Sequence, residues 1–453
     1  MTHPLWWDGM PSARPKPPAP TDLPGRVDVA IIGGGFTGLW SAYYLLRARP
    51  DLTVLVLEAA HIGFGASGRN GGWVSALWPV SPDVLAARHG REAALAQLAA
   101  LRDTVDEVGR VCTQEGIDAG FVKGGTVVVA RNPGQALRAQ AYAGHGASWG
   151  DGTTWLGPSE AAERLAAQDI HGATANPNCA RVHPRRLVDG LAAAVTRRGG
   201  TIVEGARVGR FGPGQVVLED GRRVTARHVL RATEAWTEGL PQQGRQIAPV
   251  YSLMVATAPL PEETWQTIGL GEREVFSDHG HVIIYGQRTV DDRIAFGGRG
   301  APYHLGSSIR PEFDEDPAVF AVLRRTLTTL LPQLEGVDFT HAWGGPLGIA
   351  RDWHPSVGHD ATTGVGWAGG YVGDGVAATN LAGRTLAALV TGIPDPVTAL
   401  PWVGHRSPRW EVEPLRWLGV NAGLRLAHLA DREEEHTDRP ARLGSLLSRL
   451  TNH

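Results

Sequence analysis

The chain has 453 residues, of which 42% are hydrophobic and 20% are charged. This balance is typical of a folded globular protein, and the length corresponds to about three average domains. The net charge of −3, without a long basic run, argues against a nucleic-acid partner. Lys16 and Lys123 are the only lysines among 43 basic residues. Any chemistry that needs a lysine amine must therefore use one of these two.

Cysteine usage and hydropathy limit the class of protein further. Cys112 and Cys179 lie far apart and form no CxxC pair, which argues against a disulfide scaffold and a cysteine-ligated metal. The N-terminal stretch lacks the basic and apolar regions of a signal peptide. The most apolar stretch, residues 27–46, contains Asp28 and four glycines, so we predict no membrane span and expect the cytoplasm as the location.

The first elements in chain order form a βαβ unit. Residues 1–25 are rich in proline and predict an extended arm that lies over the surface. Residues 27–32 are a short apolar run that predicts a buried parallel strand. Residues 36–49 have helical periodicity, and residues 53–57 predict a second buried strand.

The rest of the chain alternates between the two patterns. Helices are predicted at residues 83–117, 136–148, 158–168, 187–198 and 317–331. Strands are predicted at residues 122–130, 201–204 and 229–232, in a hairpin at 215–225, and repeatedly between 246 and 300. Residues 365–392 repeat the strand–glycine–helix pattern of the front. The nucleotide-binding pattern therefore opens the chain and returns near its end, which predicts interleaved domains.

A dinucleotide-binding motif lies between the first strand and the first helix. Residues 33–38 (GGGFTG) fit GxGxxG, and Glu58 follows at the end of the second strand. Gly33 permits the tight turn, Gly35 lets the backbone approach a pyrophosphate, and Gly38 lets helix and strand pack closely. The helix N-terminus favours the phosphates, and the Glu58 carboxylate accepts hydrogen bonds from a ribose. The motif alone does not choose between FAD and NAD.

A second glycine cluster, residues 63–73 (GFGASGRNGGW), follows directly after this acid. With it, the sequence resembles the D-amino-acid-oxidase-like superfamily of flavoproteins, and the string SGRNGG resembles the branch that contains γ-glutamylputrescine oxidases. The resemblance runs from about residue 26 to 395. Its further marks are the segments 180–191, 229–236, 285–303, 344–357 and 369–383.

This resemblance implies an α/β fold in which a Rossmann-like FAD-binding domain is interleaved with an α+β substrate domain built on an antiparallel sheet. The implied FAD-binding domain comprises residues 26–111, 180–245 and 340–395. The implied substrate domain comprises residues 112–179 and 246–339, and the tail 396–453 is expected to be helical. Within the tail, residues 415–430 are amphipathic, which is more typical of a helix packed on the body than of a membrane anchor.

The resemblance also implies which residues hold the cofactor. The implied FAD-binding residues are Gly33, Gly35, Phe36, Thr37, Gly38, Glu58, Ala59, Gly65, Ala66, Ser67, Arg69, Asn70, Gly71, Gly72, Val208, Ala232, Thr233, Trp236, Gly345, Gly370, Val372, Gly373, Gly375 and Val376. The sequence departs from the family at Asp374, where relatives often have histidine, and at Glu234, where they often have asparagine or glycine. Sarcosine oxidases attach FAD through a cysteine near Gly345, and its absence here predicts non-covalent FAD.

Catalytic candidates come from the predicted substrate domain. Amine oxidation by a flavin needs little acid–base machinery, because the cofactor carries the difficult step. The candidates are Tyr251, Tyr285, Arg299, Trp343 and His354, with Tyr303 and Arg351 as further substrate contacts. Aromatic rings flank an alkylamine, and arginines bind a carboxylate. Core packing for the aromatic residues and structural ion pairs for the arginines remain the alternatives.

The sequence thus predicts an FAD-dependent amine oxidase that uses O2 on a small-molecule amine. A dehydrogenase on the same scaffold, an amino-acid or aminophosphonate oxidase, and a flavin-binding protein without turnover stay open. No metal site is predicted, because residues 278–281 (DHGH) lack companion ligands at a recognisable spacing. Sarcosine-type oxidases use a lysine near the flavin for oxygen. The matching segment, 294–299, has none, and Arg299 is the candidate in its place. The specific amine and the oligomeric state stay open.

Overall fold

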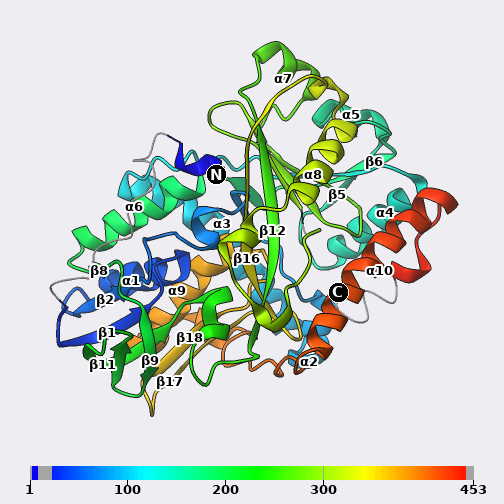
Figure 1. The fold of residues 1–453 in the computed structure, drawn as a ribbon. Helices are drawn as coiled ribbons and strands as arrows, with labels where there is room; N and C mark the ends of the chain where they lie inside the picture. The colour runs from blue at the N-terminus through cyan, green and yellow to red at the C-terminus, as the bar shows by residue number, and fades with distance from the viewer. Residues whose placement is uncertain (1–2, 9–22, 299, 445–453) are drawn as a thin grey trace.

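The protein is built on two large sheets that occupy different halves of the molecule (Figure 1). The computed structural model describes residues 3–8, 23–298 and 300–444. The first sheet and its helices fill the lower left of Figure 1, and the second sheet stands in the centre and upper right. The mixed α/β fold with two interleaved sheets agrees with the predicted fold class.

The first sheet has a parallel centre in the order β17-β18-β11-β1-β2-β8. Its central strands are short β-branched runs that are buried on both faces, as expected for parallel strands covered by helices. The strands are β1 (Arg26–Ile32), β2 (Val54–Leu57), β8 (Thr201–Val203), β9 (Val208–Gly212), β10 (Gln215–Leu218), β11 (Arg223–Arg231), β17 (Ser356–Asp360) and β18 (Val365–Gly369). Strands β9 and β10 extend β11 as an antiparallel meander, so the hairpin predicted at 215–225 is present.

Helices α1 and α9 pack against each other on this sheet. A methyl group at Gly383 of α9 would lie 2.7 Å from the backbone carbon of Trp40, so the glycine allows a close approach of the two helices. The helices of this half are α1 (Phe36–Ala48), α2 (Pro82–His89), α3 (Arg91–Glu115), α6 (Pro184–Arg197) and α9 (Gly375–Thr391). Strands β3 (Trp73–Ser75) and β7 (Cys179–Arg181) pair as a small separate sheet.

The second sheet is antiparallel except for the pair β13 and β4, in the order β16-β12-β15-β14-β13-β4-β6-β5. Its strands are β4 (Thr126–Ala130), β5 (Thr154–Leu156), β6 (Gly172–Asn176), β12 (Ile247–Thr257), β13 (Val275–Asp278), β14 (Ile284–Arg288), β15 (Ile294–Gly298) and β16 (Phe339–Ala350). The helices of this half and the tail are α4 (Pro133–Ser148), α5 (Pro158–Arg164), α7 (Glu262–Ile268), α8 (Pro317–Leu330) and α10 (Leu415–Thr437). Tail helix α10 is held on α4, where Glu434 pairs with Arg138.

Three sequence predictions differ from the structure in detail. The helix predicted at 83–117 is two helices, because Gly90 adopts φ +88° between α2 and α3. The strand predicted at 122–130 begins at Thr126. Strand β16 pairs with β12 from Phe339 to Ala350, so the segment 340–350 lies in the second sheet, although the predicted division gives it to the FAD-binding domain. The long strand β16 continues the second sheet past residue 340, where the predicted boundary lies.

Residues 3–8 differ from the predicted surface arm, and residues 9–22 of that arm lie outside the described residues. Of residues 1–25, the structure describes 3–8 and 23–25. Leu5–Trp7 form a 3₁₀ turn, here called the N-terminal turn, in which Leu5 and Trp6 are 4% and 1% exposed. They pack with Met254, Ala256 and Trp343 on one face of the second sheet. Apolar side chains therefore anchor a segment that its prolines suggested would lie on the surface.

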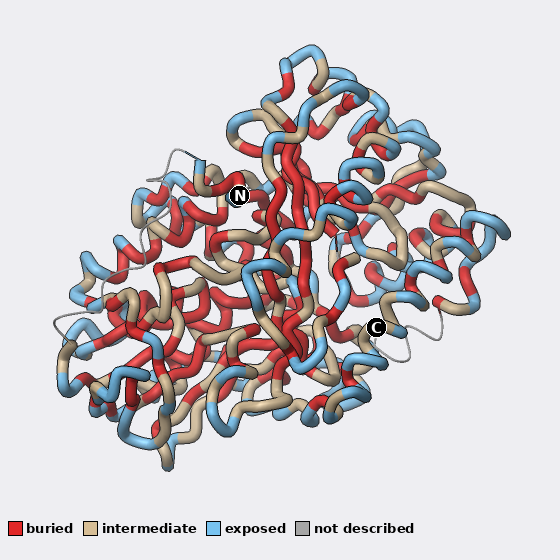
Figure 2. The backbone as a smooth tube through the Cα atoms, in the orientation of Figure 1, coloured by how far each residue is buried: buried red, intermediate tan, exposed pale blue. Residues whose placement is uncertain are grey.

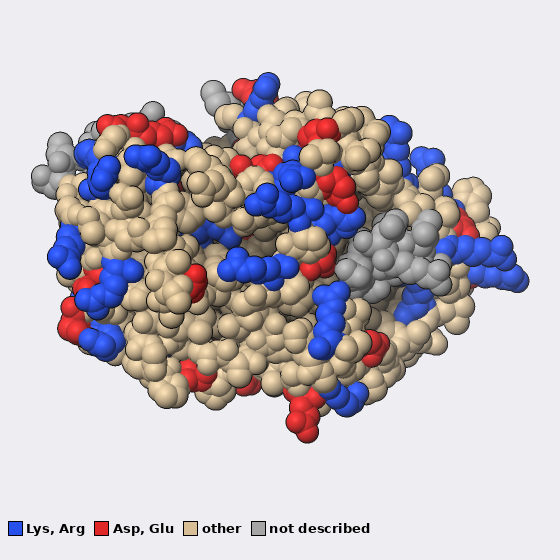
Figure 3. Space-filling model, turned by 90° about the horizontal axis from the view of Figure 1, so that it is seen from below, with Lys and Arg blue, Asp and Glu red and all other residues tan. Residues whose placement is uncertain are grey.

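Burial follows the two sheets, whose strands form the interior of both halves (Figure 2). Basic and acidic side chains are interspersed on the face seen in Figure 3. Among the described residues, no helix combines the length and the apolar character that crossing a membrane requires.

Candidate cofactor and active site

The loop between β1 and α1 has the backbone geometry that the GxGxxG motif predicts. Gly33 has φ +112°, and a side chain there would lie 2.4 Å from the carbonyl oxygen of Ala232. A side chain at Gly38 would lie 2.0 Å from the carbonyl of Gly33. Helix α1 begins after Gly35 with no side-chain cap and no acid in its first turn. The start of this helix is therefore suited to a phosphate.

The acid that follows β2 reaches this same loop. Oε2 of Glu58 accepts a hydrogen bond from the Gly34 amide at 2.8 Å, and Oε1 accepts one from the Ala60 amide. Burial raises the pKa of Glu58, while these two amides oppose the shift. The carboxylate stands beside the glycine turn, where a ribose-binding acid is expected.

The second glycine cluster folds back onto the first. Ser67, in the 3₁₀ turn Ala66–Gly68, accepts a hydrogen bond from the Phe36 amide at 2.8 Å. Asn70 ties the cluster internally, because its amide group donates to the carbonyls of Ala66 and Ser67 and accepts from the Gly72 amide. The two glycine-rich segments are thus joined at the start of α1.

Close packing requires glycine at several positions of this cluster. A side chain at Gly65 would lie 2.8 Å from the Trp236 ring. One at Gly71 would lie 2.7 Å from the Tyr285 ring, which belongs to β14 of the second sheet. The cluster therefore lies where the two halves of the molecule meet.

Three tryptophans hold successive carbonyls of this cluster. The indole N–H of Trp7 donates to the Gly68 carbonyl at 3.1 Å. That of Trp343 donates to the Arg69 carbonyl at 2.8 Å, and that of Trp6 to the carbonyl of the next residue, Asn70, at 2.8 Å. We call residues 68–70 the clamped loop. The roles of Trp6 and Trp7 were not predicted, and the adjacent tryptophans in a proline-rich arm are the signal that points to them.

The Arg69 side chain forms hydrogen bonds and an ion pair with residues outside the clamped loop. Its guanidinium donates to the Phe64 carbonyl at 2.9 Å and the Gly344 carbonyl at 3.1 Å, and it pairs with Asp314 at 2.5 Å. It also lies over the Phe64 ring. Burial raises the pKa of Asp314, while Arg69 opposes that shift. Arg69 therefore connects the glycine cluster to β16.

The third glycine-rich segment, residues 369–376, links β18 to α9. The Tyr371 hydroxyl lies 3.0 Å from the Thr37 hydroxyl, which brings this segment to the first turn of α1. Val372 is fully buried at φ +57°, an unusual conformation for a β-branched residue. Such local strain persists only where the surroundings fix it, and it is common at ligand sites.

Glu234 holds this segment in place from the opposite side. Its carboxylate accepts hydrogen bonds from the amides of Gly370 at 2.8 Å and Tyr371 at 3.2 Å, and it stands beside Gly348 of β16. Burial raises the pKa of Glu234 to about 7, while the amides of Gly370, Tyr371 and Gly348 and the guanidinium of Arg231 oppose the shift. This carboxyl group therefore titrates near neutrality between the two halves.

Glu234→Gln is expected to change how thermal stability depends on pH. Because the folded-state pKa of Glu234 lies above its ordinary value of 4.5, the folded protein holds this proton more tightly than the unfolded chain. Its stabilising contribution is complete below about pH 4.5 and is lost as pH rises through 7. The melting temperature of the wild type should thus fall relative to that of the variant between pH 5 and 8. Parallel profiles for both proteins would contradict this, and the exposed Glu263→Gln variant serves as the control.

Two of the catalytic candidates lie at the clamped loop. Tyr285 packs on Gly71, and its hydroxyl lies 2.8 Å from that of Ser252 on β12. Trp343 is 2% exposed and packs against Trp6 with ring centroids 6.1 Å apart. The face of the second sheet that meets the glycine cluster is therefore aromatic.

The other catalytic candidates are placed differently. Tyr251 points from β12 to the opposite face of the sheet, where it packs with Leu253 and Phe313. His354 is fully buried, stacks on His405 at 3.9 Å and binds the Pro355 carbonyl. Burial lowers its pKa to about 4. His354 thus lies in a buried histidine pair, whereas Tyr251 lies close enough to the Arg69–Asp314 pair for both charges to act on its hydroxyl.

The arginine candidates and Tyr303 add little to this site. Arg299 lies outside the described residues. Arg351 pairs with Glu411 at 2.9 Å, and the Tyr303 hydroxyl donates to Glu413 at 2.8 Å. Both contacts join the body to the segment before α10, so they fit the structural alternative.

Except for Val208, the remaining implied cofactor residues fall on the same three segments, beside them or on β16. Ala232 and Thr233 follow β11, next to Gly33. Gly345 lies on β16, 3.4 Å from the Arg69 side chain when a methyl is placed there. Val208 begins β9 and is buried on the other face of the first sheet. Ala59 follows Glu58, and Gly373, Gly375 and Val376 surround the start of α9.

These residues fit FAD on structural grounds. The N-cap residues of helices α1 and α9 make no side-chain cap, and the first turn of α1 is joined to the segment before α9 through Thr37 and Tyr371. An acid stands at the glycine turn, and the glycine cluster leads from there to the aromatic face of the second sheet. The chain therefore has the features expected of a flavin dinucleotide site: a glycine turn at a helix start, an acid beside it and a further glycine-rich loop.

Comparisons with known proteins agree with this class. The family model for DAO, FAD dependent oxidoreductase, matches residues 28–389. The chain is 30% identical to a probable oxidoreductase OrdL from Rhizobium meliloti (strain 1021) over 404 residues, covering 85% of this chain and 88% of the relative. It is also 30% identical to the gamma-glutamylputrescine oxidoreductase of Escherichia coli (strain K12) over 371 residues, covering 81% and 84%. The chain belongs to the DAO family of FAD-dependent oxidoreductases.

Solved structures confirm the fold. Glycine oxidase from Geobacillus kaustophilus superposes with a TM-score of 0.71 at 21% identity, covering 85% of this chain and all of that one. L-proline dehydrogenase from P.horikoshii gives a TM-score of 0.69 at 20% identity, covering 84% and 98%. At such identities the likeness concerns the fold. It confirms the predicted α/β class, and the family match confirms FAD as the cofactor.

Proposed function

We propose that this FAD-dependent oxidoreductase oxidises the carbon–nitrogen bond of a primary or secondary amine and passes the electrons to O2. The observation that carries the proposal is the meeting of the glycine cluster with an aromatic face: Gly71 packs on Tyr285, and Trp343 binds the clamped loop. Rings at this place suit an alkylamine chain. The 30% identity to a gamma-glutamylputrescine oxidoreductase supports an amine as the substrate.

In this proposal the chain's own residues bind the cofactor and orient the substrate. The start of α1 and Glu58 hold the pyrophosphate and ribose, and the clamped loop with Ser67 directs the cofactor toward the second sheet. Bound FAD would supply the acceptor for a hydride from the carbon next to the amine nitrogen. Tyr285 and Trp343 exclude water and position that carbon. The imine then takes up water and yields a carbonyl product with ammonia from a primary amine, or a smaller amine from a secondary one, while O2 takes the two electrons and two protons as H2O2.

We further propose that FAD is held without a covalent bond. Gly345 offers no thiol, and the two cysteines of the chain, Cys112 and Cys179, are buried. Precipitating the purified protein with acid should release all of the flavin into the supernatant. Yellow colour that stays with the washed pellet would contradict this.

Lys123→Met is expected to leave reoxidation of the flavin by O2 nearly unchanged. Lys123 forms a surface ion pair with Asp106 at 2.6 Å, and the two side chains are 35% and 64% exposed. Exposed pairs of this kind contribute little, about 0–1 kcal/mol, so the fold should also tolerate the change. Stopped-flow mixing of the reduced enzyme with O2 measures the rate, and a tenfold loss would contradict our assignment of this residue.

Turnover assays test the proposed function. Oxygen uptake and peroxide are measured together across polyamines, N-methyl amines, amino acids and aminophosphonates, with an artificial dye as the alternative acceptor. One peroxide per amine consumed supports the oxidase. Dye reduction without oxygen uptake would show a dehydrogenase, and turnover confined to amino acids or aminophosphonates would replace the proposed substrate class.

A further inference from the structure

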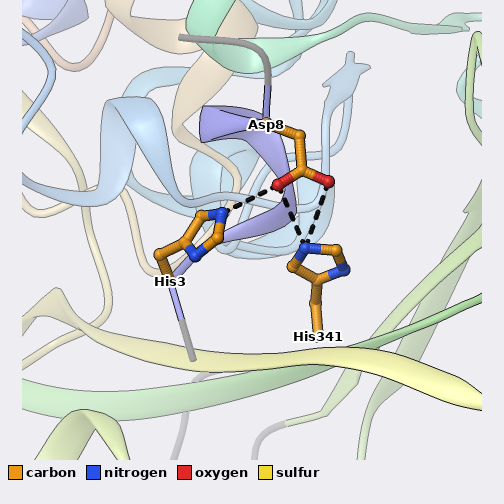
Figure 4. Close-up of side chains that lie close together, drawn as sticks. All are labelled: His3, Asp8 and His341. Carbon is orange, nitrogen blue, oxygen red and sulfur yellow. Dashed lines mark hydrogen bonds and ion pairs between the residues drawn. The ribbon is translucent and has the colours of Figure 1, made fainter. Parts of the chain in front are cut away.

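Side chains that can ligate a metal ion bracket the N-terminal turn. His3 precedes Leu5–Trp7, Asp8 follows it, and His341 of β16 faces both (Figure 4). Nε2 of His3 lies 2.7 Å from the Asp8 carboxylate, and Nε2 of His341 lies 3.1 Å from it. The three ligand atoms all lie within 4.8 Å of one another. Two segments more than 300 residues apart thus present their donor atoms to one point.

The donor set matches a transition-metal ion in kind and spacing. Two imidazoles and one carboxylate are common ligands of Zn²⁺, and in a tetrahedral site with bonds of about 2.0 Å the ligand atoms lie about 3.3 Å apart. To reach that spacing, the nitrogen–oxygen distance of 2.7 Å must open by about 0.6 Å and that of 3.1 Å by about 0.2 Å. Three protein ligands leave the fourth position to water.

The ring of His341 is held in the orientation that a ligand needs. Its Nδ1 lies 2.8 Å from the Thr340 hydroxyl, which itself accepts a hydrogen bond from Arg293 at 2.9 Å and contacts the Thr257 carbonyl. Metal-binding histidines nearly always have such a partner on the second ring nitrogen. The His341 side chain is 11% exposed, compared with 57% for His3 and 40% for Asp8. His341 is therefore a fixed, mostly buried ligand, and it faces His3 and Asp8, which are accessible to solvent.

In a second group of candidate ligands, the carboxylates already have other partners. His281, Asp431 and Glu434 also lie close together. Glu434, however, is bound by both Nε and Nη2 of Arg138 at 2.7 Å, and Asp431 accepts the amides of His281 and Val282. A guanidinium already supplies the positive charge at that place.

We propose that His3, Asp8 and His341 bind a divalent transition-metal ion, Zn²⁺ in the first instance, which fastens the N-terminal turn to β16. The consequence reaches the clamped loop, because the same turn carries Trp6 and Trp7, whose indoles hold Asn70 and Gly68. The inference stands apart from the proposed function, because ion binding is measured without amine or turnover.

Isothermal titration calorimetry of the full chain with ZnCl2, in a buffer without chelator, tests the proposal. The FAD-loaded wild type should bind one ion per chain at this site, and His341→Gln and Asp8→Asn should each weaken that binding at least tenfold. If His341→Gln, which lies on β16, disturbs folding, Asp8→Asn at its exposed position still tests the site. His145→Gln is the matched control, because His145 forms an exposed pair with Asp83 that has no third ligand among the residues that the structure describes.

A melting experiment tests whether the ion fastens the turn. Saturating ZnCl2 should raise the melting temperature of the wild type and of His145→Gln, but not that of Asp8→Asn, because an ion that binds only the folded chain stabilises it. Absence of binding, or equal binding by the wild type and both ligand variants, would overturn the metal site. Binding without a rise in melting temperature would overturn its role in fastening the turn.

Discussion

Gly35→Val is expected to abolish FAD binding while the protein still folds. Gly35 has φ −85° and ψ −173°, which any residue adopts, and a side chain there would meet only the Ser67 hydroxyl at 2.8 Å. Rotation of Ser67 relieves this contact at the loss of its hydrogen bond from the Phe36 amide, about 1 kcal/mol, which the fold should tolerate. The branched side chain would instead occupy the space in front of the uncapped helix start, where the pyrophosphate approaches. We expect FAD affinity to fall by at least about 100-fold, equivalent to about 2.7 kcal/mol.

The measurement is the flavin content of the purified variant, together with its circular dichroism and melting temperature. Gly212→Val is the matched control, because Gly212 lies at the end of β9 with open space around its added side chain. Gly38→Val would not serve, since its side chain would lie 2.0 Å from the Gly33 carbonyl and disturb the fold itself. A folded Gly35→Val protein with full flavin content would contradict the placement of the cofactor.

Trp6→Ala is expected to destabilise the protein by about 3–5 kcal/mol and to weaken FAD binding. The first effect follows from the cavity that a nearly fully buried tryptophan leaves. The second follows from the loss of the indole that holds the Asn70 carbonyl. Trp6→Phe separates the two, because it keeps most of the packing and removes only the donor. Its cost should be about 1–3 kcal/mol, with FAD affinity about tenfold lower.

Urea unfolding and FAD titration of the apoprotein measure these effects. Trp265→Ala is the matched control, because Trp265 is 2% exposed and donates to the Asp292 carbonyl at 3.3 Å, yet it belongs to the separate core of the second sheet. It should lose comparable stability while the folded protein keeps its FAD affinity. Equal FAD affinity in Trp6→Phe and the wild type would show that the N-terminal turn does not position the clamped loop.

The sequence predicted best what depends on neighbours in the chain. The turn at Gly33, the helix predicted at 36–49 and the acid at Glu58 lie within one βαβ unit. The structure has the helix at Phe36–Ala48 and places Glu58 beside the turn. The hairpin that leads into β11 and the strand–glycine–helix unit at 365–391 could be predicted from sequence in the same way, because turn residues and apolar runs mark them locally.

The parts that sequence reasoning missed depend on contacts between distant segments. Trp6 lies 64 residues from the Asn70 carbonyl that it binds, and Glu234 lies more than 130 residues from Gly370. No periodicity or spacing reports such pairs. The surroundings of Tyr251 and His354 have the same cause: strand alternation turns Tyr251 to the face of Leu253 and Phe313, and His354 packs against His405. Their catalytic roles stay predictions.

Anaerobic reduction of the bound flavin tests the central claim most directly. The purified holoenzyme is mixed without oxygen with one amine at a time, and the visible flavin absorption is followed. The account predicts that at least one primary or secondary amine bleaches the flavin, with one amine consumed per flavin, and that admitting O2 restores the colour with one peroxide formed. A flavin that dithionite bleaches but that no amine of the panel reduces would contradict it.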